Sequence, residues 1–571
     1  MSQVLHFAKS YRKQIILGPV FKFLEAIFEL ILPLLMASLV DDGIQKGNWP
    51  IVVNRAIWML VISIIGLGCA VVCQYFASVA SQGYGTELRN QLMKKVNQLS
   101  HQELNDFGTD TLITRMTNDI NQVQLALAML IRLVVRAPFL SIGAVVMAFF
   151  IDWQMGLIFL IVLPTFCLIL FGIITRSVPL YQKVQSYLDR INEIVAQNLS
   201  GVRVIRAFSR RKTEVDRFDE STDKLSSVYV RVSNISALLN PATTLIMNIG
   251  VLGILTIGGF KVNIGGLQQG QILALVNYMN QMLLALIVVS NLVVIFTRAF
   301  ASASRIEEVF DATVEIHDPK ESITPKKTGG AIQFSHVDFR FSADFGLALK
   351  DIDFTVEAGK TIGITGPTGS GKTALTQLIP RFYDVADGAV LVDDVDVRKW
   401  PLTDLRKNVG TVQQTAILFT GTIRENLQWG KNDATDEECW RALEIAQAQE
   451  FVSHLPQGLD TPVYEGGKNL SGGQQQRLTI ARALIKQPEI LILDDSLSAL
   501  DYQTDYNLRQ TLKGLDCTVL VISQRIRSIQ DASQIFVMEA GRLVAKGTHE
   551  KLLETSQEYQ EIVASQEEGN Q

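Results

Sequence analysis

The first half of the chain is dominated by long apolar stretches that alternate with polar segments. Most of these stretches reach the roughly 20 residues that a helix needs to cross a lipid bilayer. They occupy residues 14–40, 56–84, 137–151, 155–175, 234–260 and 272–298. The third stretch is short but gains length from the preceding IRLVVR, and Asp152-Trp153-Gln154 forms a tight turn before the fourth. The pattern predicts an all-α polytopic membrane domain with six transmembrane helices over residues 1–305.

The polar segments between these stretches predict the orientation in the membrane. Residues 85–136 and 176–233 keep a helical pattern and are rich in Lys and Arg, whereas the alternate loops hold only Lys46, Arg55 and Lys261. Positively charged loops stay on the cytoplasmic side. We therefore expect a multi-pass protein of the cell membrane with both termini in the cytoplasm, and with helices that continue beyond the bilayer.

The character of the sequence changes after about residue 301. HDPKESITPKKTGG is a polar stretch with Pro and Gly, which is typical of a linker, here assigned to residues 306–330. Strands and helices then alternate, which predicts an α/β domain with a largely parallel sheet over residues 331–571. We expect this second domain to be cytoplasmic.

Composition supports contact with lipid and excludes a nucleic-acid partner. The mean hydropathy is +0.21, and a positive value is unusual for a soluble protein of this length. The formal net charge of −5 leaves no basic surface for nucleic acid. The five cysteines form no C-x-x-C pair, so buried small side chains are expected rather than metal ligands or disulfides.

A glycine-rich loop lies between an apolar strand and a helix in TIGITGPTGSGKTAL. Its members are Gly366, Pro367, Thr368, Gly369, Ser370, Gly371, Lys372 and Thr373. In this pattern the backbone N–H groups surround the β-phosphate, the lysine reaches the β- and γ-phosphate oxygens, and the hydroxyl of Thr373 holds Mg²⁺. The motif predicts nucleotide binding.

Two adjacent acids follow the buried strand ILIL. Asp494 is placed to organise Mg²⁺ through its water shell, and the alternative is a helix cap. Asp495 is the candidate catalytic base, because open α/β sheets bind ligands at the carboxyl ends of their strands.

The segment NLSGGQQQRLTIARAL, between these motifs, gives the second domain a resemblance to the ATPase domain of ABC transporters. The residues that match the family signature are Leu470, Ser471, Gly472, Gly473 and Gln474. The resemblance implies that ATP and Mg²⁺ bind, with Thr373, Gln414 and Asp494 as the Mg²⁺ residues. Gln414 corresponds to the glutamine of the Q-loop.

Other family segments follow in the expected order. The run from Tyr464 to Gly467 resembles the cross-talk segment of exporters, and Ser498 and Asp501 belong to the D-loop. Phe341 stands where the family has a tyrosine that stacks on adenine, and the alternative is a core aromatic.

The membrane half resembles the same family. TLITRMTNDINQV and NLSGVRVIRAFSRRKTEVDRF are similar to cytoplasmic segments of ABC exporters with six membrane helices fused to the ATPase domain. The resemblance implies a half-transporter that must dimerise, because each ATP lies between the P-loop of one subunit and the signature of the other. It also implies a multidrug or lipid exporter with a small amphipathic substrate.

Two residues depart from the family pattern. Asp495 replaces the usual glutamate that polarises the attacking water, and Gln524 replaces the switch histidine. The aspartate is one methylene shorter, and glutamine cannot carry positive charge. The pair is typical of the degenerate subunit in bacterial heterodimeric exporters. We expect this chain to hold ATP with little hydrolysis while its intact signature completes a competent site on a non-identical partner.

The sequence leaves the cargo and two other functions open. Glu25 and Glu29 on the first helix are candidates for attracting cationic amphiphiles, unless Lys22 neutralises Glu25. Aromatic residues in the membrane helices can line an apolar cavity or face lipid. The alternatives to the heterodimer are a homodimeric exporter with two poor sites and a regulatory membrane ATPase that moves no cargo.

Overall fold

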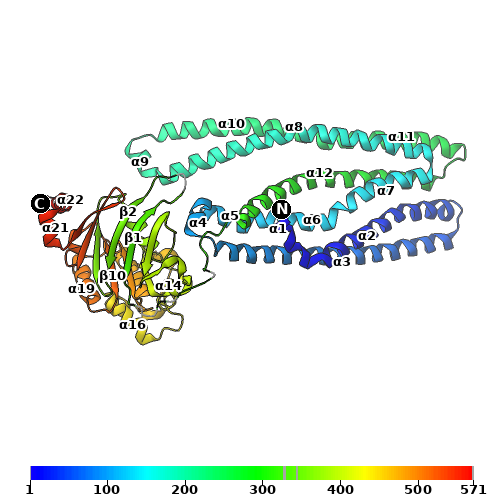
Figure 1. Cartoon of the computed structure of the whole chain (residues 1–571). Coiled ribbons are helices and arrows are strands. Elements are labelled where there is room, and N and C mark those ends of the chain that lie inside the picture. The colour runs from blue at the N-terminus through cyan, green and yellow to red at the C-terminus, as the bar shows by residue number, and fades with distance from the viewer. Residues whose placement is uncertain (1, 320, 324, 326–328, 343–344, 569–571) are drawn as a thin grey trace. The chain divides into compact units, whose positions relative to one another are not determined.

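The computed structural model describes residues 2–319, 321–323, 325, 329–342 and 345–568. The chain forms two compact units, of which the first comprises the residues up to Val96 together with Asp110–Asp311. The second comprises Asn97–Thr109 and the residues from Ala312 onwards. The first unit is helical and the second is α/β, which confirms the predicted fold class (Figure 1).

The first unit contains six helices that are long and apolar enough to cross a membrane, counted over the residues described. They span Gln3–Ile44, Trp49–Val96, Thr109–Ile151, Trp153–Ser200, Arg211–Asn263 and Gln269–Asp311. Their α-helical segments are α1 (Ser2–His6), α2 (Arg12–Ser38), α3 (Trp49–Val96), α5 (Thr109–Thr114), α6 (Ile120–Met129), α7 (Arg136–Ile151), α8 (Trp153–Ser200), α9 (Val202–Ala207), α10 (Arg211–Ala237), α11 (Leu239–Asn263) and α12 (Gln269–Asp311). A 3₁₀ turn (Phe7–Tyr11) and three π-helical turns (Leu39–Ile44, Arg115–Asp119 and Leu130–Val134) join some of them.

The side chains of these helices are distributed as expected for a protein in lipid. Large apolar groups point outwards, with Leu60 62%, Phe150 80% and Leu168 72% exposed. A soluble protein rarely exposes so much contiguous apolar surface. Where helices touch, small residues allow close approach, since a Cβ on Gly143 would lie 2.4 Å from Leu30.

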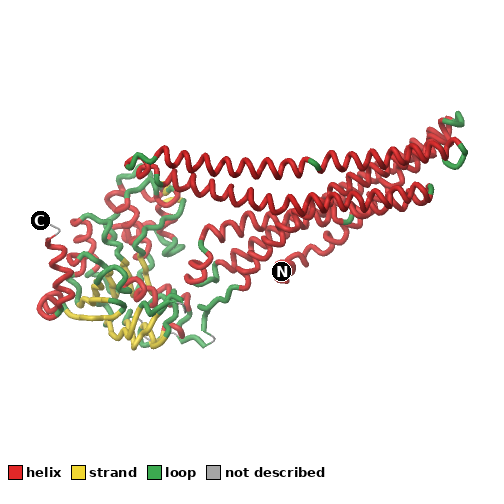
Figure 2. The backbone as a smooth tube through the Cα atoms, turned by 90° about the horizontal axis from the view of Figure 1, so that it is seen from above, coloured by secondary structure: helices red, strands yellow, loops and turns green. Residues whose placement is uncertain are grey.

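Helices α8 and α10 run side by side over most of their length and are joined by α9 (Figures 1 and 2). Helices α2, α3, α6, α7 and α12 pack on one another, and α7 and α11 also pack on α8. The α8–α10 pair carries exposed apolar side chains along its length, including Phe171, Leu188 and Tyr229. This pair therefore has a face that no other part of the described chain covers.

The second unit is built on two main sheets. The six-stranded sheet has the order β12-β11-β3-β10-β9-β6, parallel except for the β11–β12 hairpin, and the four-stranded antiparallel sheet has the order β2-β1-β4-β5. The strands are β1 (Ile332–Phe339), β2 (Leu349–Val356), β3 (Thr361–Thr365), β4 (Asp387–Val392), β5 (Val395–Asp396), β6 (Val409–Val412), β7 (Gly421–Thr422), β8 (Pro462–Val463), β9 (Ile490–Asp494), β10 (Thr518–Ile522), β11 (Gln534–Glu539) and β12 (Arg542–Gly547). The helices are α4 (His101–Phe107), α13 (Lys372–Leu378), α14 (Leu402–Asn408), α15 (Ile423–Gln428), α16 (Asp436–Ile445), α17 (Gln449–Ser453), α18 (Gly472–Leu484), α19 (Tyr502–Leu512), α20 (Ile526–Ile529), α21 (His549–Thr555) and α22 (Gln557–Glu568).

The six-stranded sheet separates two hydrophobic cores. In β9, Ile490 and Ile492 point into the core shared with the antiparallel sheet, whereas Leu491 and Leu493 point into the core formed with α16 and α18. All four side chains are at most 1% exposed. A run of consecutive apolar residues is required because a central parallel strand is covered on both faces. The strand fixes the positions of Asp494, its last residue, and of Asp495, which follows it.

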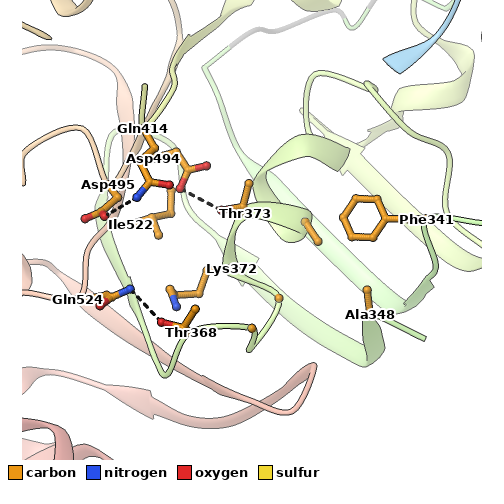
Figure 3. A pocket seen from close by; sticks show the side chains of 13 residues that line it. Phe341, Ala348, Thr368, Lys372, Thr373, Gln414, Asp494, Asp495, Ile522 and Gln524 are labelled. Carbon is orange, nitrogen blue, oxygen red and sulfur yellow. Dashed lines mark hydrogen bonds between the residues drawn. The ribbon is translucent and has the colours of Figure 1, made fainter. Parts of the chain in front are cut away.

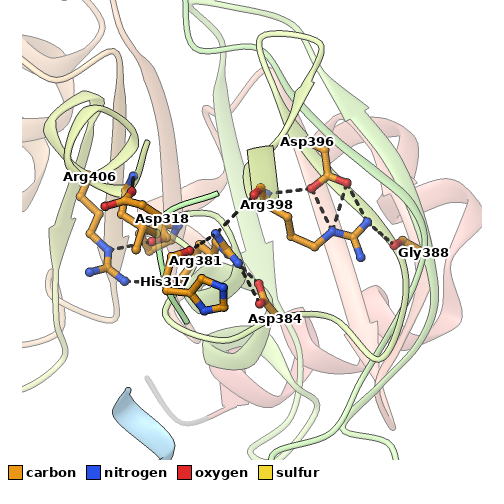
Figure 4. A network of polar contacts seen from close by, with 10 residues as sticks. His317, Asp318, Arg381, Asp384, Gly388, Asp396, Arg398 and Arg406 are labelled. Atoms are coloured by element: carbon orange, nitrogen blue, oxygen red, sulfur yellow. Dashed lines mark hydrogen bonds and ion pairs between the residues drawn. The ribbon is translucent and has the colours of Figure 1, made fainter. Parts of the chain in front are cut away.

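Part of the segment assigned to the linker is held to the second unit by a polar network (Figure 4). Arg381 donates to the carbonyl of His317 at 3.3 Å and pairs with Asp384 at 2.8 Å, and Asp318 accepts from the backbone N–H of Leu402 at 2.7 Å. Arg381 itself is only 6% exposed. The chain therefore enters this unit along a defined path, at least as far as Asp318.

Candidate functional site

The candidate site lies where four parallel strands end. In the order β3, β10, β9 and β6, the ends of these strands carry the glycine-rich loop, Gln524, the Asp494–Asp495 pair and Gln414. Parallel strands bring their carboxyl ends to one edge of the sheet, so four segments far apart in sequence meet (Figure 3). They form a cavity of about 340 Å³ whose lining includes Phe341, Thr368, Lys372, Thr373, Gln414, Asp494, Asp495 and Gln524.

The glycine-rich loop adopts a conformation that only glycine tolerates at three positions. Gly366, Gly369 and Gly371 have φ angles of +146°, +81° and +97°. A Cβ on Gly366 would lie 2.1 Å from the carbonyl oxygen of Met538, and one on Gly371 would lie 2.9 Å from that of Ala348. The glycines thus let the backbone curve tightly around a space that fits a phosphate group.

Lys372 is anchored on this loop and carries its positive charge into the cavity. Its Nζ donates to the carbonyl oxygens of Gly366 and Pro367, both at 2.8 Å. Burial lowers the pKa of Lys372, and the negative charges of Asp495 and Asp494 oppose this change. A phosphate oxygen would give the ammonium group a stronger, charge-assisted acceptor than the carbonyls that it contacts here.

Asp494 and Thr373 face each other across the cavity. The Thr373 hydroxyl donates to Asp494 Oδ1 at 3.3 Å. Burial raises the pKa of Asp494, the bond from Thr373 lowers it, and the nearby charge of Asp495 raises it. A buried carboxylate beside a second acid is stabilised by a cation. These two oxygens, together with the Gln414 amide oxygen, are the hard ligands that Mg²⁺ prefers, so the site fits that ion.

Asp495 is held by the backbone and by the Q-loop glutamine. Its φ of +46° is in the left-handed region, and Gln414 Nε2 donates to Asp495 Oδ2 at 3.1 Å. Burial raises the pKa of Asp495, while Arg525, Lys372 and the bond from Gln414 lower it. The carboxylate lies in the cavity and has one oxygen occupied by the glutamine.

Gln524 lines the same cavity, just beyond the end of β10, the strand that pairs with β9. Its Nε2 donates to the hydroxyl of Thr368 at 3.5 Å, so the side chain points towards the glycine-rich loop (Figure 3). Its backbone carbonyl accepts from Gln566 Nε2 at 2.6 Å, and Gln566 Oε1 accepts from the N–H of Ile526 at 3.0 Å. Helix α22 therefore fixes the segment that carries Gln524, a contact that no sequence motif predicts.

Phe341 is at the rim of the cavity and is not a fully buried core residue. It is 41% exposed and packs edge-on against Phe339 and Tyr383, at 4.8 Å and 5.4 Å between ring centroids. This packing fixes the ring while leaving part of it accessible. An aromatic ring held in this way can stack on a flat heterocycle.

Tyr383 also contacts α4, which comes from the amino-terminal half of the sequence. The His101 ring lies 4.5 Å from that of Phe382, and Asn105 Nδ2 donates to the Tyr383 hydroxyl at 3.4 Å. The segment Asn97–Thr109 thus belongs to the second unit although it lies within the range 1–305. Its polar residues resemble any solvent-exposed helix, so the sequence could not reveal this contact.

The signature residues lie at the surface and do not line the cavity. Ser471 caps α18, since its hydroxyl accepts from the N–H of Gln474 at 3.3 Å and its own N–H donates to Gln474 Oε1 at 2.9 Å. A Cβ on Gly472 would meet no atom of the described residues within 4 Å, and Leu470 and Gly473 are half-buried. Within one chain, the structure brings the glycine-rich loop (the P-loop) and the two acids together, but it keeps the signature residues apart from them.

The D-loop connects the acids to α19. The Ser498 hydroxyl donates to the carbonyl of Asp495 at 2.7 Å, and Asp501 Oδ2 accepts from the N–H of Thr504 at 3.0 Å as the cap of α19. These hydrogen bonds give both residues a structural role. Ser498 in turn helps to hold the backbone of Asp495 in its left-handed conformation.

Two family models match the chain. Residues 15–286 match the ABC transporter transmembrane region, and residues 349–498 match the ABC transporter family. A solved "bacterial Atm1-family ABC exporter with ATP bound" superposes with a TM-score of 0.79 over 97% of this chain and 98% of that one, at 24% identity. This likeness supports the fold.

Several curated relatives are similar over most of their length. The "Uncharacterized ABC transporter ATP-binding protein YfiB" of Bacillus subtilis is 36% identical over 99% of this chain and 98% of its own length. An "ATP-dependent lipid A-core flippase" of Desulfotalea psychrophila is 31% identical over 97% and 93%, and the "Probable multidrug resistance ABC transporter ATP-binding/permease protein YheI" of B. subtilis is 34% identical over 83% and 81%. The chain belongs to the ABC transporter family, as an exporter-type half-transporter with its membrane domain fused to its ATPase domain.

Proposed function

We propose that this chain is the degenerate-site subunit of a heterodimeric ABC exporter that uses ATP to move amphipathic compounds, either lipids or drugs, across the cell membrane. Its ATPase domain and both termini lie in the cytoplasm, in keeping with the concentration of Lys and Arg in residues 85–136 and 176–233. Its own P-loop holds ATP with slow hydrolysis. Its signature completes the faster site of a non-identical partner.

The observation that carries this proposal is the chemistry at the hydrolytic side of the cavity. Asp495 is the only acid besides Asp494 among the described residues that line the cavity, and it is engaged by Gln414. Its side chain is one methylene shorter than the usual glutamate, and a displacement of about 1 Å in a reacting group can lower a rate about a hundredfold. Gln524 supplies an amide that cannot become a cation. Both groups needed to activate water are therefore weakened.

The binding side of the cavity keeps every group needed to hold ATP. The backbone N–H groups of the glycine-rich loop and Lys372 would contact the phosphates, and Phe341 would stack on adenine. Thr373, Asp494 and Gln414 would hold Mg²⁺, which when bound would supply positive charge to offset that of the phosphates. Tight binding combined with slow turnover follows from this contrast.

Two features support dimerisation. The signature residues lie at the surface and away from the cavity of their own chain, so they are placed to meet a nucleotide held by another subunit. In the part predicted to continue beyond the bilayer, the α8–α10 pair exposes apolar side chains such as Leu188 and Tyr229 along a face that the described chain leaves uncovered. A partner subunit would bury that face.

The nature of the cargo is inferred from relatives and from the membrane helices. A lipid A-core flippase and a probable multidrug resistance transporter are both similar to this chain over most of its length. The first name states a lipid cargo and the second a role in multidrug resistance, and we take amphipathic compounds as the class that joins the two. The aromatic and aliphatic side chains of the membrane domain suit such molecules.

The decisive experiment restores the two altered residues. The chain is purified with its native partner, the partner's hydrolytic base is removed, and ATPase activity is measured in lipid nanodiscs. We expect Asp495→Glu combined with Gln524→His to raise the rate of this chain's own site at least about tenfold, because the carboxylate then reaches the attacking water. Gln503→His, on the exposed side of α19, is the control and leaves the rate unchanged.

A second measurement uses the partner with its base intact. Asp495→Ala is expected to leave the ATPase rate of the heterodimer nearly unchanged, whereas Ser471→Ala lowers it because the signature serves the partner's nucleotide. A rate halved by Asp495→Ala, with ATP binding preserved, contradicts the division of labour. Rapid ATP hydrolysis and transport by the chain alone would instead favour the homodimer. Hydrolysis without movement of any amphiphile in inside-out vesicles would favour a regulatory ATPase.

A further inference from the structure

A small cavity in the membrane domain lies outside the nucleotide site. It has a volume of about 150 Å³ and is formed by α2, α7, α12 and the π-turn before α7. Its polar lining consists of Glu29, Arg136 and Gln281, one residue from each of the three helices. Its apolar lining consists of Leu133, Ala137, Leu140, Leu284, Ala285 and Val288. Three polar side chains therefore line a cavity whose other walls are apolar.

Two of these side chains form an ion pair. Arg136 donates through one terminal nitrogen to both carboxylate oxygens of Glu29, at 3.0 Å and 2.8 Å. Both side chains are about one-third exposed, at 30% and 29%, so neither charge is sealed from the cavity. The pair is neutral overall. Glu29 is therefore not a free anion that would select for a cation.

Arg136 and the neighbouring Gln281 each keep one hydrogen-bonding atom that is not used. Arg136 Nε and Gln281 Oε1 are buried, and neither has a partner among the described residues. The first is a donor with positive charge and the second is an acceptor. Buried polar atoms without partners are costly, and a ligand that satisfies them gains that free energy.

The cavity lies deep in the membrane domain. Glu29 is 15 residues from the end of its span at Ile44, Arg136 is 15 residues from Ile151, and Gln281 is 12 residues from Gln269. At about 1.5 Å per helical residue, the three side chains lie about 18–22 Å from the hairpin end of their helices. The hydrocarbon core is about 30 Å thick. Measured from the loops that join α2 to α3, α7 to α8 and α11 to α12, this depth is smaller than the thickness of the hydrocarbon core.

Lys22 and Glu25 form a separate ion pair on the same helix. Lys22 Nζ lies 2.7 Å from Glu25 Oε2, and neither residue lines the cavity. Their mutual pairing is the neutralisation that the sequence left as an alternative for Glu25. The pair is a matched control, because it has the same charges on the same helix without access to the cavity.

We propose that the cavity is a binding site for the head group of a zwitterionic amphiphile, with an ammonium group on Glu29 and Gln281 and an anionic group on Arg136. This inference deepens the proposed export function and rests on it for the direction of transport. A zwitterion matches a neutral pair of opposite charges, and its donor and acceptor atoms satisfy Gln281 Oε1 and Arg136 Nε. A singly charged head would leave one member of the pair without its counter-charge in a low-dielectric site. The apolar walls would contact the beginning of the acyl chain.

The test uses the full chain with its native partner in nanodiscs, without nucleotide. Three probes carry the same fluorescent acyl chain and differ in the head group: phosphoethanolamine, a primary amine or a sulfate. Fluorescence anisotropy gives the three dissociation constants. We expect the phosphoethanolamine probe to bind at least tenfold more tightly than the other two.

Single substitutions then shift this preference in opposite directions. Glu29→Gln is expected to lower affinity for the phosphoethanolamine probe at least tenfold and to favour the sulfate, whereas Arg136→Gln favours the amine. The double variant Lys22→Gln with Glu25→Gln keeps the wild-type preference. Gln281→Leu leaves the ion pair in place and lowers affinity for the phosphoethanolamine probe about threefold. This variant covers the case in which breaking the ion pair prevents folding.

The outcomes separate this site from the function on which it rests. Equal affinities for all three probes in the wild-type complex overturn the proposal, and so does an equal loss for all three probes in Glu29→Gln and Arg136→Gln. A complex that pumps amphiphiles on ATP addition but binds the probes equally contradicts the site alone. A complex that binds the zwitterion selectively but moves none of the probes contradicts export and keeps the site.

Discussion

The two sides of the nucleotide cavity differ in how closely their residues match the pattern of an ABC ATPase. On the side that follows β3, the glycines, Lys372 and Thr373 provide a complete phosphate-binding loop. On the side that follows β9 and β10, Asp495 and Gln524 are the residues to which the proposed function assigns slow activation of water. Both sides are built on the same buried sheet, so the difference does not arise from the fold.

This contrast teaches that binding and hydrolysis depend on different kinds of precision. Phosphate binding uses many backbone N–H groups whose positions are set by the curved loop, and it tolerates changes elsewhere. Hydrolysis depends on one carboxylate at the correct distance from one water molecule. Under the proposed function, the shorter side chain at position 495 slows turnover and leaves the loop untouched.

The largest effect is expected from the binding side. Lys372→Ala should weaken ATP binding about a hundredfold, because charge-assisted hydrogen bonds to phosphate oxygens contribute about 1.5–3 kcal/mol each. Binding of a fluorescent ATP analogue to the heterodimer measures the effect. The control is Lys360→Ala, an exposed lysine just before β3, which leaves affinity unchanged. Undiminished binding in Lys372→Ala would show that the loop does not hold the phosphates as proposed.

A smaller effect is expected from the adenine end of the same side. Phe341→Ala should weaken ATP binding about tenfold, since stacking of a base on an aromatic ring contributes about 1–3 kcal/mol. Phe341→Tyr keeps the ring and should bind within about twofold of wild type. Titration with ATP and with inorganic triphosphate distinguishes the causes, because only ATP has a base to stack. An equal loss for both ligands would indicate that Phe341 supports the fold of the rim instead.

The sequence predicted those parts of the molecule in which local pattern and structure coincide. The continuous run Ile490–Leu493 had to be a strand covered on both faces, and the glycine-rich loop had to follow a strand, so the edge of the sheet that holds the site was predictable. The long apolar stretches predicted the six spanning helices for the same reason. The pairing of Glu29 with Arg136 was not predictable, since 107 positions separate the two residues and only packing brings them together.

Contacts made by ordinary polar helices were equally hidden. Helix α4 carries no apolar stripe or motif that distinguishes it from a solvated helix, yet its His101 and Asn105 reach Phe382 and Tyr383. Gln566 of α22, which bonds to the backbone on both sides of Arg525, is one of many glutamines near the end of the chain. Such contacts depend on which surfaces the tertiary structure brings together, and a local sequence pattern does not predict that.

The smallest effect is expected where the binding side meets α4. Burial lowers the pKa of His101, and the positive charge of Arg406 lowers it further. Since the folded state favours the neutral ring, the contribution of His101 is complete above its unfolded pKa of about 6.5 and is lost as the pH falls towards the lower folded value. Hydrogen-exchange protection of α4 should therefore decrease below about pH 6.5.

His101→Asn removes this titration and so separates it from general acid effects. It should weaken α4 by about 1 kcal/mol at neutral pH, the amount expected for one aromatic pair, and it should flatten the pH dependence. Glu103 and Asp106 are left unchanged so that the other charges of α4 stay constant. If His101→Asn keeps the full decrease of protection below about pH 6.5, another group controls the contact between α4 and the Phe382–Tyr383 pair. In that case protonation of His101 would not affect the Phe382–Tyr383 pair, and so would not affect the aromatic contact between Tyr383 and Phe341 at the rim of the cavity.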